Sequence, residues 1–187
     1  MVTLRHLLVF LCLISACFAQ RTPRKIADVP IATSDGKTIR ISQYHDKVLM
    51  IVMMKTDCDE CHQTLDFLAK LQKNLAPRGF QAIAISLGPD RSALKPFAER
   101  YQFPFPVGYL EKDPAIKFLD LKETAHPVVP YVMFVDWMGS VRFQYPGDAP
   151  IFNSAEKNLG QIADGLLRQA AEKKGPQYET RPAGSKQ

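Results

Sequence analysis

Two cysteines separated by two residues stand where a predicted buried strand meets a predicted helix. The run Val48–Met54 is apolar at every position, as in a strand that is covered on both faces. After Cys58 and Cys61, leucines recur at helical spacing, which predicts a helix that ends near Ala76. One sulfur then lies at the helix N-terminus, where free N–H groups and the helix dipole favour a thiolate. This arrangement favours thiol–disulfide exchange.

The first nineteen residues are predicted to be a targeting segment. Arg5 gives a positive start, residues 7–14 are apolar, and residues 15–19 are small enough for cleavage after position 19. The apolar run is too short for a comfortable transmembrane span. We therefore expect a signal peptide over 1–19 and an extracytoplasmic protein, either periplasmic or secreted. An alternative is a lipoprotein signal that ends at residue 16, with Cys17 lipidated and the protein bound to a membrane; an uncleaved anchor comes third.

Export changes how the cysteines are interpreted. The chain has four cysteines, and cleavage after residue 19 leaves Cys58 and Cys61 alone in the mature protein. A bridge across two residues closes a very short loop and restrains the unfolded chain little. We therefore expect the pair to have a chemical role and not a structural one.

The length of 187 residues suits one domain with tails. We expect a flexible leader over 20–30, a domain over 31–174 and a disordered tail over 175–187. The net charge of +5 is spread along the chain without a basic stripe of interleaved aromatics, so no nucleic-acid partner is expected.

The elements predict an α/β fold with a mixed central sheet and helices on both faces. A turn at residues 34–37 joins two short N-terminal strands, and a second buried strand over 81–87 completes a right-handed β–α–β unit. A helix, a strand and a helix then form a central insertion before a hairpin and a last helix. Their expected ranges are about 90–101, 107–110, 113–121, 131–136 with 141–145, and 153–174.

This order of elements resembles the thioredoxin fold, and over residues 28–172 it resembles the TlpA/ResA-like branch of extracytoplasmic thiol–disulfide oxidoreductases, which borders on the redoxin group. The resemblance lies in the Cys58-x-x-Cys61 motif, in Val129-Pro130 about 70 residues later, in the run from Thr33 to Lys47 and in Tyr145-Pro-Gly147. The targeting segment and the central insertion of about 30 residues also fit that branch.

The resemblance implies a role for each matching residue. Cys58 is the attacking thiolate and Cys61 the resolving thiol, and the two form a disulfide when oxidised. Pro130 is a cis-proline, and the backbone of Val129 binds an extended substrate segment. No bound cofactor or metal is implied. The expected partners are protein disulfides and a membrane or periplasmic electron donor; an apocytochrome, as in cytochrome c biogenesis, another oxidoreductase or a pool of damaged disulfides would all fit. A monomer is expected.

The motif departs from the family pattern in three ways. Thr56-Asp57 stand where an aromatic residue usually precedes the first cysteine, and Trp137 lies in the predicted hairpin turn. The strand before the motif has no carboxylate that could take the proton of Cys61. The residues between the cysteines, Asp59 and Glu60, are acidic.

The acidic residues predict the direction of electron transfer. Negative charge around Cys58 disfavours its thiolate and so destabilises the reduced form. We expect a reductant with a potential nearer to thioredoxin's, about −270 mV, than to the strong-oxidant value of about −120 mV. His62, in the first helical turn, is a further candidate for tuning the thiols.

Three other functions use the same residues. The two cysteines with His126 would suit a Cu(I) delivery module. The sequence from Cys58 to His62 also spells a c-type haem attachment motif. A peroxiredoxin-type peroxidase would share the fold, but such enzymes carry a Pro-x-x-x-Thr-x-x-Cys loop, and here Thr56 lies only two residues before the first cysteine.

Overall fold

The computed structural model describes residues 23–87 and 91–174. The predicted signal peptide, Cys17 and the predicted tail lie outside these residues. The described strands form one sheet of eight, in the order β1-β8-β7-β4-β5-β6-β2-β3. Their bounds are β1 Arg24–Lys25, β2 Ile31–Thr33, β3 Thr38–Ile39, β4 Val48–Met54, β5 Phe80–Leu87, β6 Val107–Leu110, β7 Tyr131–Val135 and β8 Ser140–Tyr145.

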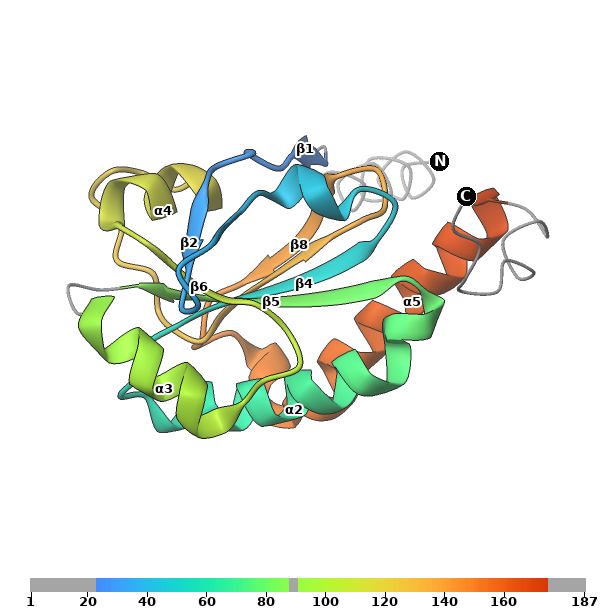
Figure 1. Ribbon diagram of the computed structural model, residues 1–187. Coiled ribbons are helices and arrows are strands. Elements are labelled where there is room, and N and C mark those ends of the chain that lie inside the picture. The colour runs from blue at the N-terminus through green and yellow to red at the C-terminus, as the bar shows by residue number, and fades with distance from the viewer. Residues whose placement is uncertain (1–22, 88–90, 175–187) are drawn as a thin grey trace, which may run out of the picture.

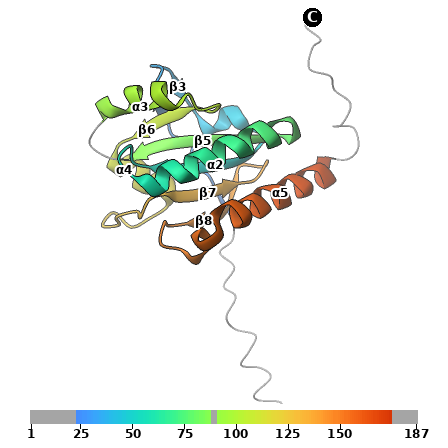
Figure 2. The same cartoon turned by 90° about the horizontal axis from the view of Figure 1, so that it is seen from below.

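Helices cover both faces of this sheet (Figure 1). The α-helices are α2 Asp59–Leu75, α3 Leu94–Tyr101, α4 Lys112–Leu119 and α5 Ala155–Lys174, and the 3-10 helices are η1 Ile41–Tyr44, η2 Ala76–Arg78, η3 Arg91–Ala93 and η4 Pro150–Ser154. α2, α3 and α5 lie on one face, and α4 lies on the other. Figure 2 shows α2 and α5 side by side across their face. No helix in 23–87 or 91–174 is both long enough and apolar enough to cross a membrane.

β4 lies in the middle of the sheet and connects its two halves. It runs parallel to β5 and antiparallel to β7, and all seven of its residues are buried. Since side chains alternate along a strand, Met50, Val52 and Met54 pack under α2 and α5, whereas Leu49, Ile51 and Met53 pack under α4. A strand buried on both faces needs no polar positions, which explains the uninterrupted apolar run.

The predicted fold class is confirmed. The β–α–β unit consists of β4, α2 and β5, and the insertion consists of α3, β6 and α4. The N-terminal extension, β2 and β3, pairs with the insertion because Ala32 of β2 lies opposite Tyr109 of β6. The extension therefore widens the sheet at the edge that the insertion creates.

Part of the predicted flexible leader belongs to the sheet. Arg24 and Lys25 form β1 and pair with Val141 and Ser140 of β8. The Arg24 guanidinium also donates to the carbonyl of Phe118, at 2.9 Å. The flexible-leader prediction is therefore wrong at these residues, because cross-strand pairing and this side-chain bond hold a segment that has no apolar pattern of its own.

The predicted helix starts differ slightly from the observed ones. α4 begins at Lys112, after an extended Glu111, so Asp113 lies in the first turn instead of at the N-cap. α5 begins at Ala155, and Asn153 belongs to the preceding 3-10 turn η4. A carboxylate in the first turn still interacts favourably with the helix dipole.

Candidate active site

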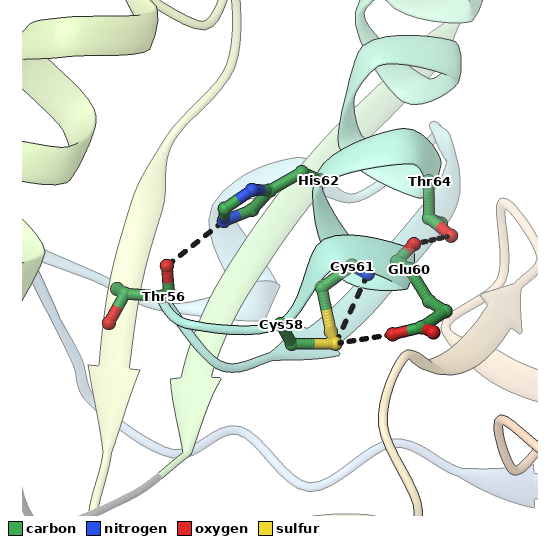
Figure 3. Close-up of a disulfide and its surroundings, with 6 residues drawn as sticks. All are labelled: Thr56, Cys58, Glu60, Cys61, His62 and Thr64. Atoms are coloured by element: carbon green, nitrogen blue, oxygen red, sulfur yellow. Dashed lines mark hydrogen bonds between the residues drawn. A yellow bond between two sulfur atoms is a disulfide. The ribbon is translucent and has the colours of Figure 1, made fainter.

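Cys58 and Cys61 lie together at the N-terminus of α2 and form a disulfide (Figure 3). Cys58 is the N-cap residue, with an extended backbone, and Cys61 lies in the first turn. Their Cα atoms are 5.2 Å apart, within the normal range for a disulfide. Cys61 is fully buried, whereas Cys58 is partly exposed. A partner can therefore reach one sulfur and not the other.

The start of the helix supplies a donor to the exposed sulfur. The backbone N–H of Cys61 points at Sγ of Cys58, with the nitrogen 3.2 Å from the sulfur. This contact is the side-chain N-cap bond of α2, with sulfur as the acceptor. After reduction, the same N–H and the helix dipole favour a thiolate at Cys58.

Acidic side chains act against this stabilisation. Oε2 of Glu60 lies 3.8 Å from Sγ of Cys58, and Asp57 and Asp59 are exposed on either side. A carboxylate at that distance repels a thiolate. The two effects oppose each other at one sulfur.

His62 contacts the loop before Cys58 and not the sulfurs. Its Nε2 lies 2.9 Å from the carbonyl oxygen of Thr56, which indicates the tautomer that donates from this nitrogen. Its ring packs against Phe97 and Tyr101 of α3, with centroids 5.4 Å away in both cases. Figure 3 shows the imidazole directed to Thr56, away from the disulfide. His62 therefore holds the loop that leads into Cys58.

The Val129–Pro130 peptide bond is cis, as the family resemblance implies. Tyr131, the next residue, pairs with Met53, so the cis-proline lies beside the end of β4, where the cysteine loop begins. Val129, Pro130 and Glu60 line one groove of about 910 Å³ between α2 and the start of α5. The cis-proline loop and the tip of α2 thus border the same groove.

Gly147 supports this loop and was not recognised from the sequence as a site residue. Its N–H donates to the carbonyl of Val128, at 2.9 Å, and a Cβ at position 147 would lie 2.7 Å from the carbonyl oxygen of Val129. That distance is shorter than carbon–oxygen contacts allow, so a side chain here would displace the loop. The turn pattern Pro146-Gly147-Asp148 is the sequence signal for such a close approach.

The departures noted in the sequence are also seen in the structure. Among the described residues, Asp136 is the only buried carboxylate. Its Oδ1 accepts from the backbone N–H groups of Met138 and Ser140 in the β7–β8 turn. Trp137 lies in the same turn, near Leu49 at the start of β4 and therefore at the opposite end of this strand from Cys58. Neither side chain belongs to the cysteine site.

His126 does not complete a metal site with the cysteines. It is exposed and lines a separate cavity with Lys55 and Glu111. Within 23–87 and 91–174, no group of three histidine, cysteine or acidic side chains is placed to hold a metal ion. The copper alternative therefore has no three-donor site in these residues.

Comparisons with known proteins place these features in a wider group. The sequence pattern of the AhpC/TSA family matches residues 23–144. A thiol:disulfide interchange protein DsbE from Chlorobium tepidum has a similar structure, with a TM-score of 0.68 and 19% identity over 80% of this chain and 99% of that one. A thioredoxin from Neisseria meningitidis has a TM-score of 0.64 and 18% identity, and the match covers 84% of this chain and 100% of that one. An exposed lipoprotein thioredoxin from Streptococcus pneumoniae has a TM-score of 0.58 and 20% identity, and the match covers 75% of this chain and 100% of that one.

Proposed function

The chain belongs to the AhpC/TSA family and is a thioredoxin-like thiol–disulfide oxidoreductase; we propose that it is exported and that it reduces disulfides in other proteins through Cys58 and Cys61. One observation carries the proposal. Two sulfurs lie at one helix tip, one partly exposed and the other fully buried, beside a groove that the cis-proline loop shares.

The reaction begins with the reduced protein. The Cys58 thiolate attacks one sulfur of a partner disulfide, and the other partner sulfur leaves as a thiolate that takes up a proton. Cys61 then loses its proton and attacks Sγ of Cys58, and the first partner sulfur leaves in turn. Two electrons have passed to the partner, and the Cys58–Cys61 disulfide remains until an electron donor reduces it.

The burial of Cys61 suits the resolving step. A fully buried thiol does not compete for external disulfides, but it lies within bonding distance of Cys58 once the mixed disulfide forms. No buried carboxylate near the motif is among the described residues, so water or the leaving thiolate is the proposed acceptor of the Cys61 proton.

The acidic side chains around Cys58 support electron transfer from this protein to its partner. Glu60, Asp57 and Asp59 disfavour the Cys58 thiolate, which makes reduction of this disulfide less favourable and makes the dithiol a stronger reductant. Equilibration with glutathione tests the direction. A potential above about −180 mV would contradict it.

Export is supported by the targeting segment of the sequence. The proposed location is extracytoplasmic, with lipidation at Cys17 as the variant that would bind the protein to a membrane. The proposed partners are protein disulfides, with an apocytochrome as one candidate, and a membrane or periplasmic electron donor.

Trapping of partners tests the proposal. In Cys61→Ser the resolving thiol is missing, so partner proteins should stay joined to Cys58 and be released by dithiothreitol. Cys58→Ser/Cys61→Ser is the control and should capture none. If Cys61→Ser captures no more protein than this control, the proposed role is refuted.

Peroxidase activity is the competing function within the same fold. It predicts rapid, stoichiometric oxidation of the Cys58 thiol by hydrogen peroxide at low concentration, with continued turnover when a thiol donor is supplied. The proposed reductase predicts instead that protein disulfides oxidise the dithiol faster than peroxide does.

A further inference from the structure

Val129 separates two cavities at the end of β4. One is the groove between α2 and the start of α5. The other, of about 550 Å³, lies between Lys55 and α4. Val129 lines both, and it packs against the apolar cluster on each face of the sheet. A segment that binds across Val129 therefore reaches from one face to the other.

The charged side chains of the groove on the α2 and α5 side are predominantly acidic. Its charged side chains are Glu60, Asp66, Asp148, Glu156, Lys70 and Lys157. Lys70 is paired with Glu156, at 3.2 Å, which leaves three carboxylates against the amine of Lys157. Asp57 and Asp59 add further negative charge beside the exposed sulfur. The groove is thus negative in a chain whose net charge is +5.

The cavity on the α4 side has an apolar lining and a mainly basic rim. Its apolar residues are Leu87, Ala115, Ile116, Ala125, Pro127 and Val129. Lys55 and Lys112 stand at its rim with Glu111. The Arg91 guanidinium lies 5.9 Å from the ring centroid of Tyr109, another lining residue, and adds positive charge. This cavity suits an apolar side chain and disfavours a basic one.

We propose, on the basis of the oxidoreductase function above, that the substrate binds as an extended segment across Val129, with basic residues in the groove and an apolar side chain in the cavity. The charged side chains of the two cavities have opposite net charge, and the cavities meet at Val129, next to the cis-proline beside the end of β4, so a segment with this polarity matches both at once. An acidic segment is repelled by the groove and by the carboxylates around the sulfur.

Synthetic peptides with one central cysteine test this preference. The cysteine is joined to thionitrobenzoate, and the reduced protein releases this group in a measurable reaction. The first peptide has lysines on one side of the cysteine and a leucine on the other. It is made in both orders, with the lysines before or after the cysteine, and the order that reacts faster is used for all three peptides. The second replaces the lysines by glutamates, and the third replaces the leucine by glycine. We expect the first peptide to react about fivefold faster than the second and about tenfold faster than the third.

Variants of residues that line each cavity assign the effect to that cavity. Asp66→Lys/Asp148→Lys should reverse the preference for lysine over glutamate, and high salt should weaken it in the parent protein. Ala125→Phe fills the cavity and should abolish the preference for leucine. Glu172→Lys, on an exposed position of α5, is the matched control and should change neither.

The reaction with uncharged 2-hydroxyethyl disulfide tests the oxidoreductase function separately from the substrate preference. This disulfide should react equally with the parent protein and with the Glu172→Lys control. The preference of each cavity variant is a ratio of peptide rates within that variant, so it does not depend on the variant's basal rate. Equal rates for the three peptides, or preferences that the variants leave unchanged, would overturn the substrate inference alone. No reaction of the parent protein with 2-hydroxyethyl disulfide would overturn the oxidoreductase function itself.

Discussion

Replacing Glu60 by glutamine should increase the fraction of Cys58 that is present as the thiolate at a given pH. The carboxylate lies 3.8 Å from Sγ and is exposed, so the dielectric of water is the appropriate choice. Coulomb's law then gives a repulsion of about 1 kcal/mol between the carboxylate and a thiolate. This corresponds to about a sixfold higher ratio of thiolate to thiol in the variant and, where the thiolate dominates the reduced form, to a potential about 20 mV higher.

The alkylation rate of Cys58 as a function of pH measures this effect. The Cys61→Ser background leaves Cys58 as the only thiol at the site, and Glu172→Gln is a control that removes an equal charge far away. The difference should shrink in 1 M salt, where the Debye length is about 3 Å. If Glu60→Gln reacts with the same pH profile as its parent, the carboxylate is fully screened and the charge argument for a reductant is wrong.

Two further predictions concern stability. Gly147→Ala places a methyl group 2.7 Å from the carbonyl oxygen of Val129 and should lower the melting temperature by about 3–10 °C. Gly165→Ala in α5 is the control. Its Cβ meets no atom within 4 Å, so it should raise the melting temperature by about 1–4 °C. A Gly147→Ala protein as stable as its parent would show that the loop moves freely. A hydrogen bond from the Ser42 N–H, and then the Ser42 hydroxyl and Arg40, hold the pKa of Asp28 below its usual value. The ionised carboxylate therefore stabilises the folded protein above about pH 4, the usual pKa of an aspartate. This stabilisation is lost as the pH falls through the lowered pKa of the folded state. Asp28→Ala should therefore melt about 1–3 °C lower than its parent at pH 7, and this difference should shrink as the pH falls below about 4. A difference that stays the same as the pH falls would refute this origin.

The sequence predicts best where one strong local pattern repeats. The apolar run of β4 and the leucine spacing of α2 need no other part of the chain to be recognised, and both elements lie where they are predicted. The cis state of Pro130 has no local signal, since most X–Pro bonds are trans, and only the family resemblance implied it.

Contacts between distant segments are where the sequence falls short. β1 is two basic residues with no alternation, and it forms because β8 offers an edge. Gln72 is a polar residue within the predicted helix, yet its side chain is buried and accepts a hydrogen bond from the backbone N–H of Ala82, with nitrogen and oxygen 2.6 Å apart, so it satisfies a donor of β5. The two cavities beside Val129 combine residues from six or more segments, which no single window of sequence reveals.

The unequal burial of the two sulfurs also determines which of them is oxidised first in an oxidising environment. Peroxide and other small oxidants reach Cys58 first, so sulfenic acid should form there and not on the fully buried Cys61. Cys61, close by in the first turn of α2, can condense with that sulfenic acid and expel water before the irreversible sulfinic stage is reached. The buried thiol thus protects Cys58 from irreversible oxidation.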